Sequence, residues 1–484
     1  MGDTDHTMSQ PAASRPPVIL WLRRELRLAD NPALAAAVAS GHPVLPVFVL
    51  DETAPAAWAP GGASRWWLHH SLAALGAELA ARGAPLLLRR GRYDQVIPAL
   101  AAEVGAAAVH AGLPTEPWAR AALRRVHAAL GGRLRTHLTT LAFAPTEIRT
   151  QAGTPYGVYS PFARACLARV AETGGLPAPP LAAPARLEAA PSPPGDRLAD
   201  WGLLPARPDW AGGLRAAWMP GEAGAAARLE RFRHAGLAQY AARRDLPGVA
   251  GTSMLSPHLA WGEVSVSQVW HATAGGAKFI GELLWREFAA HLLWHHPALP
   301  EAPLREAFAA MPWRDDAADL RAWQRGRTGI PIVDAGMRQL WRTGWMHNRV
   351  RMIAASFLVK HLMLPWQHGE AWFWDTLADA DLAQNSASWQ WVAGSGADAA
   401  PYFRIFNPVL QGRKFDPDGA YVRAWVPELA RLPDRWLHAP WDAPEDVLAQ
   451  AGVLLGRDYP RPLVDLAAGR QRALDAFAAL PRVA

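Results

Sequence analysis

VILWL at residues 18–22 and PVLPVFVL at residues 43–50 decide the fold class of the first part of the chain. Both are short runs of β-branched and other apolar residues, a pattern typical of buried strands. The helical pattern NPALAAAVAS lies between them. A strand, a helix and a second strand in this order predict a parallel sheet with helices on its faces.

The same alternation continues along the chain. It predicts a helix at residues 66–82, a strand at 85–90, a helix at 93–104 and a strand at 106–112. Residues 17–140 are therefore expected to form a Rossmann-like α/β domain with a parallel sheet. This part of the sequence has no GxGxxG or Walker motif, so it gives no support for classical nucleotide binding.

Three further parts differ in composition. Residues 1–16 contain no apolar run, and we expect a short disordered tail. Residues 141–220 are expected to form an interdomain linker, because much of this segment is dense in Pro, Ala and Gly. Long amphipathic segments such as 332–363 follow. Residues 221–484 are therefore predicted to form an all-α domain.

Composition limits the class of protein. The 484 residues include 49 basic and 43 acidic side chains, a net charge of +6, and nearly all of the basic ones are arginine. Arginine binds phosphate bidentately and stacks on bases, so we expect a polyanionic partner. The single cysteine excludes a disulfide framework and a four-cysteine metal site. Without a signal peptide or a long apolar run, we expect a cytoplasmic protein that does not contact membranes.

Tryptophan is the most unusual component. There are 24 tryptophans against 7 tyrosines, and many of them fall between Trp261 and Trp391. Tryptophan usually provides apolar bulk with one N–H to satisfy, but near a redox centre its ring can also pass electrons. A compositional bias explains a high count everywhere, so only position identifies the tryptophans that have such a role.

Two segments combine amide, charged and aromatic groups. In WMHNRVRM, residues 345–352, a helix would place Asn348, Arg351 and Met352 on one face and Arg349 elsewhere.

The second segment is DADLAQNSASWQW, residues 379–391. Asp379 and Asp381 form an acidic turn, and Asn385 follows it. A helix would direct Trp389 and Trp391 to opposite sides, because they are two residues apart.

Two other segments each allow two interpretations. In ELLWREF, residues 282–288, Glu282, Trp285 and Arg286 line one helical face. They could stack and hydrogen-bond a base, or Glu282 and Arg286 could simply form an intrahelical ion pair.

The segment GTSMLSPHLAWGEVS starts at Gly251. Its hydroxyl groups, on Thr252, Ser253 and Ser256, could hold a phosphate before a helix, or they could only cap that helix.

Together the four segments resemble the DNA photolyase and cryptochrome family of flavoproteins. The resemblance covers nearly the whole chain, from LWLRRELRLADNPAL at residues 20–34 to APYFRIFNPVLQGRKFDPDG at residues 400–419. It implies an N-terminal α/β antenna domain, a long linker and an all-α domain that binds FAD in a U-shaped conformation. These domains agree with those drawn from the residue patterns.

The resemblance also implies a flavin site. Arg351 would pair with Asp379, and Asp381 would contact the ribityl and ring region. Asn385 matches the position that faces the flavin N5, where photolyases carry Asn and plant cryptochromes typically carry Asp. The remaining residues of the implied site are Tyr240, Thr252, Ser253, Leu255, Ser256 and Asn348.

The family's electron-hopping chain maps to Trp389, Trp366 and Trp313, so photoreduction is expected. On the substrate side, a lesion pocket maps to Glu282, Trp285, Asn348, Met352 and Trp391, and we add Arg286 from the same helical segment. The flanking DNA contacts map to Arg244, Arg349, Arg404 and Gln411.

The function implied by the resemblance is light-dependent DNA repair by a carbon–carbon lyase. Light-excited reduced FAD would donate an electron to a cyclobutane pyrimidine dimer, the ring would split, and the electron would return. Glu282 would hydrogen-bond the flipped-out lesion. No metal is required, and we expect a monomer whose partner is UV-damaged DNA.

Three alternatives remain. A (6-4) photolyase would carry a histidine pair where Asn348 and Met352 stand. A cryptochrome photoreceptor is disfavoured by Asn385 and by the pair of Glu282 and Trp285. A helical DNA-binding protein without a cofactor would leave the acidic turn of residues 379–381 unexplained.

Two further features stay open. The family's folate-binding Asn and Glu align with Trp118 and Ala119, although Glu116 lies nearby, so a second antenna chromophore could be a folate in another geometry, a deazaflavin or absent. The histidines at 291, 295 and 296 have helical spacing but no supporting carboxylate or cysteine, and we interpret them as helix-end residues.

Overall fold

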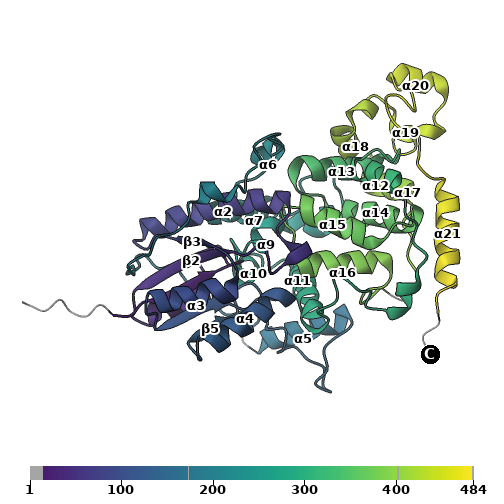
Figure 1. The fold of residues 1–484 in the computed structure, drawn as a ribbon. Coiled ribbons are helices and arrows are strands. Elements are labelled where there is room, and N and C mark those ends of the chain that lie inside the picture. The colour runs from purple at the N-terminus through teal and green to yellow at the C-terminus, as the bar shows by residue number, and fades with distance from the viewer. Residues whose placement is uncertain (1–14, 173, 400–402, 482–484) are drawn as a thin grey trace, which may run out of the picture.

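The computed structural model describes residues 15–172, 174–399 and 403–481. An N-terminal α/β domain packs beside a larger helical domain (Figure 1). Most of the predicted tail lies outside the described residues. Arg15, close to the start of the first strand, forms an ion pair with Glu188 at 2.6 Å.

The α/β domain contains a five-stranded sheet in which all neighbouring strands are parallel, in the order β3-β2-β1-β4-β5. Every residue of β1 and β2 is buried, which explains their continuous apolar runs. The predicted Rossmann-like domain is confirmed. Its strands are β1 Val18–Leu22, β2 Val44–Leu50, β3 Leu87–Arg90, β4 Ala108–Gly112 and β5 Leu134–His137.

Helices cover both faces of this sheet. Val18, Leu20 and Leu22 share a core with α1 and α2, whereas Ile19 and Trp21 pack with residues of α3 and α4 on the other face. The helices are α1 Pro32–Ala39, η1 Ala56–Trp58, α2 Gly62–Ala81, α3 Tyr93–Glu103 and α4 Pro117–Ala129.

The segment predicted as a linker, residues 141–220, contains helical elements in both its first and its last part. Helix α5, Tyr159–Ala171, packs against the helical domain, and Phe162 and Cys166 are buried in that domain's core. A short 3-10 turn η2, Leu198–Trp201, and helix α6, Gly212–Ala217, come at the other end. Between residues 172 and 197, the described residues form no helix or strand, in agreement with their Pro-rich composition.

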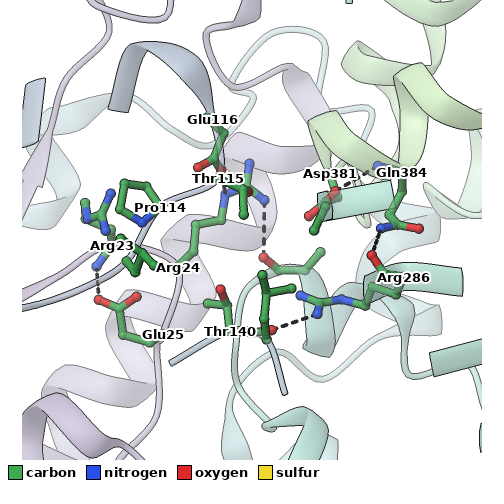
Figure 2. Close-up of a pocket in the computed structure, with 14 residues that line it drawn as sticks. Arg23, Arg24, Glu25, Pro114, Thr115, Glu116, Thr140, Arg286, Asp381 and Gln384 are labelled. Carbon is green, nitrogen blue, oxygen red and sulfur yellow. Dashed lines mark hydrogen bonds and ion pairs between the residues drawn. The ribbon is translucent and has the colours of Figure 1, made fainter. Parts of the chain in front are cut away.

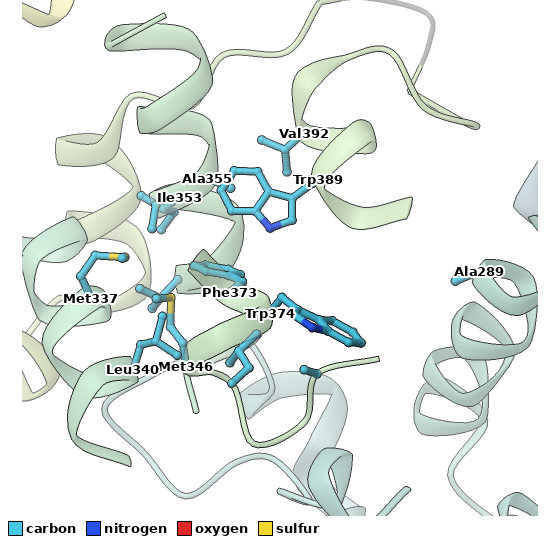
Figure 3. Packing of buried hydrophobic residues seen from close by; sticks show 14 of the residues in the cluster. Ala289, Met337, Leu340, Met346, Ile353, Ala355, Phe373, Trp374, Trp389 and Val392 are labelled. Atoms are coloured by element: carbon cyan, nitrogen blue, oxygen red, sulfur yellow. The ribbon is translucent and has the colours of Figure 1, made fainter. Parts of the chain in front are cut away.

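The predicted all-α domain is also confirmed. Its main core is apolar and surrounds Trp389 and Phe373, which lie next to each other in Figure 3. Its elements are α7 Glu222–Ala235, η3 Leu237–Gln239, α8 Tyr240–Arg243, α9 Ser256–Ala260, α10 Val266–Ala272, α11 Ala277–His295, η4 Glu306–Ala310, α12 Ala317–Gln324, α13 Pro331–Thr343, α14 Asn348–Ser356, η5 Phe357–His361, α15 Trp366–Thr376, α16 Leu382–Ala393, α17 Pro408–Phe415, α18 Ala420–Trp425, η6 Pro427–Leu429, α19 Asp434–Leu437, η7 Pro440–Asp442, α20 Glu445–Ala451 and α21 Leu466–Ala478.

One long amphipathic segment, expected at residues 332–363, is broken. Helix α13 ends because Gly344 adopts the left-handed conformation, with φ of 66°. Helix α14 begins only at Asn348, and the His347 side chain caps it by accepting from the Arg349 N–H at 3.2 Å. The chain then continues into the π-helical turn η5. The expectation that all of WMHNRVRM is helical was therefore wrong, but Asn348 and Met352 keep their one-turn spacing.

Two arginines, the buried Arg27 and the partly buried Arg24, join the domains. Arg27 donates to the carbonyl oxygens of Thr139 at 2.6 Å and Gly262 at 3.0 Å, and burial lowers its pKa to about 10. Arg24 donates to the carbonyl oxygens of Ala260 and Ala380 at 3.2 and 3.0 Å. The bond from Arg24 to the Ala380 carbonyl holds the segment before α16 against the end of β1.

Candidate functional site

A buried cluster of polar groups lies between α14, α15 and the start of α16. We use the name buried cluster for Arg351, Asp379, Glu370 and Asn385. Arg351 forms two hydrogen bonds with the carboxylate of Asp379, at 2.7 and 3.2 Å, so the predicted pairing is confirmed. The Asp379 side chain is only 3% exposed. Such a carboxylate needs its guanidinium partner, because an unpaired buried charge is strongly unfavourable.

The Asn385 amide is held in one orientation. Its Nδ2 donates to the backbone carbonyl of Glu370 at 2.9 Å, and the residue is 8% exposed. Because a carbonyl only accepts, the amide nitrogen must be the end that faces Glu370. The amide oxygen Oδ1 is therefore the end that remains available as an acceptor.

Glu370 was not identified from the sequence. It is fully buried, and Ser386 donates its hydroxyl to the carboxyl at 2.5 Å. Burial raises the pKa of Glu370 to about 8, so this side chain is a neutral acid at pH 7. A sequence signal existed, because Glu370 shares a helical stripe with the buried Trp366 and Phe373 on α15.

The loop before α9 offers donors for an anion. The backbone N–H groups of Thr252, Ser253 and Met254 have no acceptor among the described residues. Met254 has φ of 51°, a strained value for a residue other than glycine. Helix α9 has no side-chain cap, so the interpretation of these hydroxyls as a helix cap is wrong.

Nearby groups complete this region. Ser256, at the start of α9, accepts a hydrogen bond from the Trp345 indole at 3.2 Å. Tyr240 and Leu255 are buried in the helical core, and Asp381 caps α16 by accepting from the Gln384 N–H at 3.0 Å. The loop before α9 thus offers N–H groups without an acceptor in the described part of the chain, and the hydroxyls of Ser253 and Ser256 accept hydrogen bonds from Leu255 N–H and the Trp345 indole.

The tryptophans of α16 face different surroundings, as their spacing predicts. Trp389 is 2% exposed, and its ring lies 5.0 Å from Phe373 and 6.1 Å from Trp323 between centroids. Gly369 allows this packing, because a Cβ there would come within 2.1 Å of the Trp389 ring. Trp391 is partly exposed, with the Arg404 guanidinium 5.4 Å from its ring centre. Of the other two predicted hopping residues, Trp366 is buried in the main core and Trp313 packs at its edge.

A second group of charges, just after α8 and on α11 and α14, is partly exposed. We use the name surface cluster for Arg244, Asp245, Glu282 and Arg349. Arg244 pairs with Glu282, and Arg349 pairs with Asp245 at 3.0 Å. Asp245 was not identified from the sequence, and only its position beside Arg244 could have indicated it. The intrahelical pair between Glu282 and Arg286, which the sequence left open, does not form.

Trp285 has an unexpected partner. Its ring stacks on Tyr159 with the centroids 3.6 Å apart and the planes within 6° of each other. The Tyr159 hydroxyl donates to the Gly281 carbonyl at 2.6 Å, which fixes this ring on α11. Tyr159 belongs to α5, far away in the sequence, so no local pattern could have found it.

Four other predicted residues lie around this surface. Asn348 is exposed at the first turn of α14, and Met352 follows one turn later, partly exposed. Arg349 lies with its guanidinium 4.4 Å from the Phe415 ring, which joins α14 to α17, the helix that carries Gln411. Arg404 is exposed beside Trp391, in the segment before α17.

Arg286 does not belong to this surface, which corrects the sequence-based grouping. It donates to the Thr140 carbonyl at 2.7 Å and lines a pocket between the two domains (Figure 2). The reason is helix geometry: residues next to each other are separated by 100°, so Trp285 and Arg286 point to different sides of α11.

That interdomain pocket lies at the carboxyl ends of β1, β4 and β5. Figure 2 shows Arg24 and Glu116 of the α/β domain opposite Asp381 and Gln384 of the helical domain. Strands β1 and β4 are neighbours whose connections run in opposite directions, which is the switch point where open parallel sheets bind ligands. Trp118 and Ala119 do not line the pocket, but Glu116 does.

The histidines near the end of α11 have structural partners. Ring nitrogens of His291 and His295 lie 3.2 and 3.1 Å from the Pro145 carbonyl oxygen. Within the part of the chain that the structure describes, no group of three or more potential ligands could hold a metal. No helix among these residues is long and apolar enough to cross a membrane.

Comparison with known proteins identifies the family. Residues 18–185 match the family model described as DNA photolyase, and residues 279–479 match the FAD binding domain of DNA photolyase. The chain belongs to the DNA photolyase family. The photolyase resemblance inferred from the sequence is thereby confirmed.

Individual relatives of this photolyase family member cover nearly the whole chain. A deoxyribodipyrimidine photo-lyase of Agrobacterium fabrum is 48% identical over 96% of this chain and 98% of its own. Cryptochrome-1 of Arabidopsis thaliana is 38% identical over 95% of this chain and 70% of its own. The crystal structure of a class III photolyase from Agrobacterium tumefaciens is 47% identical, with a TM-score of 0.92 and coverage of 98% and 99%. 

The residues present fit the FAD of this family. The free N–H groups before α9 suit the negatively charged diphosphate. The Asn385 oxygen suits an N–H donor such as a reduced flavin N5, because its nitrogen is already used by Glu370.

Proposed function

We propose that this protein repairs cyclobutane pyrimidine dimers in DNA in a light-dependent reaction. The proposal is supported by the names of its relatives and by one structural observation, the fixed Asn385 amide in the buried cluster. A neutral amide at this position places no negative charge beside a reduced, anionic flavin. The protein is then a deoxyribodipyrimidine photo-lyase with FAD as its cofactor.

The chain's own residues would hold the cofactor in a defined order. Thr252, Ser253 and Ser256 bind the diphosphate and ribityl chain, and Arg351 with Asp379 holds the ring region. Bound there, FAD supplies the electron that light transfers to the lesion. Asn385 would offer its amide oxygen to the flavin, because the Glu370 carbonyl already holds its nitrogen. The buried surroundings exclude water and strengthen these polar contacts.

The surface cluster and the rings beside it would hold the substrate. Trp285 is kept rigid by Tyr159, so it offers a fixed platform on which a flipped-out base can stack. Glu282 hydrogen-bonds the lesion, and Asn348, Met352 and Trp391 form the other walls. Arg244, Arg349, Arg404 and Gln411 contact the DNA backbone, and such contacts are independent of sequence.

Electrons for photoreduction would pass through Trp389, Trp366 and Trp313. Two observations support this route: Trp389 and Trp366 are buried in the same core, and Trp313 packs at its edge. The proposed path would therefore run from the core to its edge.

The (6-4) photolyase alternative is not supported. Asn348 and Met352 occupy the positions of that class's histidine pair. His347, the nearby histidine, is buried as the cap of α14, and burial lowers its pKa to about 4. The ring is therefore neutral at pH 7, and it already accepts the hydrogen bond from the Arg349 N–H that caps α14. The cryptochrome alternative is weakened by Asn385 and by the photo-lyase names of several relatives.

A second chromophore would contact the interdomain pocket of Figure 2 with only a small part of its surface, because the pocket has a volume of about 30 Å³. Glu116, Arg24 and Thr140 offer charged and polar groups there, and the pocket reaches Asp381 at the start of α16. An archaeal photolyase from Sulfolobus tokodaii, 26% identical with a TM-score of 0.80, was crystallised with two FAD molecules. We further propose that the protein acts as a cytoplasmic monomer.

Illumination of the purified flavoprotein with an oligonucleotide that carries one cyclobutane thymine dimer tests the proposal. Blue light should restore the absorbance of intact thymines, whereas a dark sample and an oligonucleotide with a (6-4) photoproduct should show no change. If the flavin is bound and reduced but thymines do not reappear, the photoreceptor alternative replaces this proposal.

A further inference from the structure

A groove on the helical domain, separate from the flavin and lesion sites, is rich in arginine and tryptophan. It is formed by α12, α13, α15 and α18, and it encloses about 1040 Å³. The surface cluster lies instead just after α8 and on α11 and α14. The side chains that line the groove include no carboxylate but four arginines, Arg321, Arg325, Arg338 and Arg342.

The arginines form two short rows. Arg321 and Arg325 are one helical turn apart on and just after α12, and Arg338 and Arg342 are one turn apart on α13. Arg338 pairs with Glu428 at 2.7 Å. Across the described residues, no carboxylate lies within ion-pair distance of Arg321, Arg325 or Arg342. Three permanent cations thus face one groove without a direct ion-pair partner among the described residues, which favours an anionic ligand with several charges.

The groove also offers an aromatic surface. The rings of Trp341 and Trp372 are nearly parallel, with centroids 5.8 Å apart and planes within 4°. Trp341 is 58% exposed, the highest exposure among the large apolar side chains of this groove. An exposed indole fixed by a stacked neighbour is a preformed platform for another planar ring.

We propose that this groove binds a single-stranded segment of nucleic acid, independently of any lesion. Bases would stack on Trp341, and successive phosphates would contact Arg321, Arg325 and Arg342. A row of cations beside aromatic rings is the combination by which proteins hold single strands without reading their sequence. The groove volume of about 1040 Å³ slightly exceeds the range of ordinary ligand pockets, about 300–1,000 Å³, so the groove has room for more than one nucleotide.

A free nucleotide offers the same base and phosphate groups as a single strand. The experiment therefore has to distinguish binding of a single strand from binding of a free nucleotide. The probe is a short, labelled, lesion-free oligodeoxyadenylate, and its binding to the flavoprotein is measured in the dark by fluorescence anisotropy. An excess of unlabelled duplex with one thymine dimer occupies the lesion site. The variants are Trp341→Ala and the double variant Arg325→Ala/Arg342→Ala. Arg470→Ala, which removes an exposed arginine of α21, is the matched control.

Trp341→Ala should weaken oligonucleotide binding about tenfold, the effect of losing one stacked base. The double arginine variant should reduce the slope of log affinity against log salt by about 1.4, from two lost phosphate contacts. Arg470→Ala should change neither quantity, and all variants should keep the wild-type unfolding midpoint and light-dependent repair.

Three results would overturn the proposal. The first is that no oligonucleotide binds while the damaged duplex is present. The second is wild-type affinity in Trp341→Ala. The third is competition by deoxyadenosine monophosphate as effective as that by the unlabelled oligonucleotide, which would make the groove a site for free nucleotides instead.

Discussion

The buried cluster and the surface cluster share helix α14, but they hold their charges differently. On α14, Arg351 pairs with a carboxylate that is 3% exposed, whereas Arg349, two residues earlier, pairs with one that is 34% exposed. On α16, Trp389 is buried in the core, whereas Trp391 is partly exposed beside Arg404. Helix α16 therefore contributes one ring to the interior and one to the surface. On α14 the side chains of Arg351 and Arg349 are similarly exposed, at 24% and 19%, and it is their carboxylate partners that differ.

This difference between the buried cluster and the surface cluster follows from their proposed functions. A resident cofactor requires groups that are already in place, and the buried cluster supplies them through bonds that cannot easily rearrange. DNA has to arrive and leave, so the arginines of the surface cluster need partners that phosphates can replace. Asp245 and Glu282 are such partners, because they hold Arg349 and Arg244 in position while remaining partly exposed.

The largest expected effect concerns the tryptophans of α16. Trp389→Phe should abolish photoreduction of the oxidised flavin under blue light, because Trp389 is the first ring of the proposed electron path. Repair by chemically pre-reduced enzyme should continue. Flavin absorbance during illumination measures the first effect, and Trp391→Phe serves as the matched control that keeps photoreduction. Unchanged photoreduction in Trp389→Phe would rule out this path.

A smaller effect is expected from the two arginines of α14. Arg351→Met should lower the free energy of unfolding by about 3–5 kcal/mol, because it leaves the Asp379 carboxylate buried and unpaired. Arg349→Met should lower it by only about 0–1 kcal/mol, since water reaches Asp245. Urea denaturation followed by circular dichroism measures both. Similar losses in the two variants would contradict the distinction between the clusters.

The third effect depends on pH. Burial raises the pKa of Glu370 from 4.5 to about 8, so between these values the native state binds a proton that the unfolded state has released. Glu370 therefore makes the protein less stable as the pH rises, by about 1.4 kcal/mol per pH unit within that window. The contribution of Glu370 to the free energy of unfolding is most favourable below about pH 4.5, where its carboxyl is protonated in both the folded and the unfolded state.

Glu370→Gln removes this titration and keeps the shape of the side chain. Stability curves of the variant and the wild type, measured from pH 5 to pH 9, should therefore converge at low pH and separate as the pH increases. Parallel curves would show that Glu370 is not a neutral acid in the folded protein.

The sequence predicted those features that depend on local periodicity or on matching motifs. The strands at residues 18–22 and 43–50 were predictable because they are buried runs with clear ends, and the pairing of Arg351 with Asp379 followed from the family motif. Arg286 was misplaced because helical spacing alone does not show which side of α11 a residue faces. Tyr159 stacks on Trp285 from another helix, and such a tertiary contact leaves no mark on the local sequence.

The most direct test of the division between the clusters combines two measurements on one pair of variants. Purified Arg351→Met should contain less FAD, seen as a lower ratio of flavin to protein absorbance. Arg349→Met should keep its FAD but bind a dimer-containing duplex more weakly, with the salt slope reduced by about 0.9. The account is contradicted if Arg349→Met loses FAD to the same extent as Arg351→Met, or if it binds the damaged duplex as tightly as the wild type.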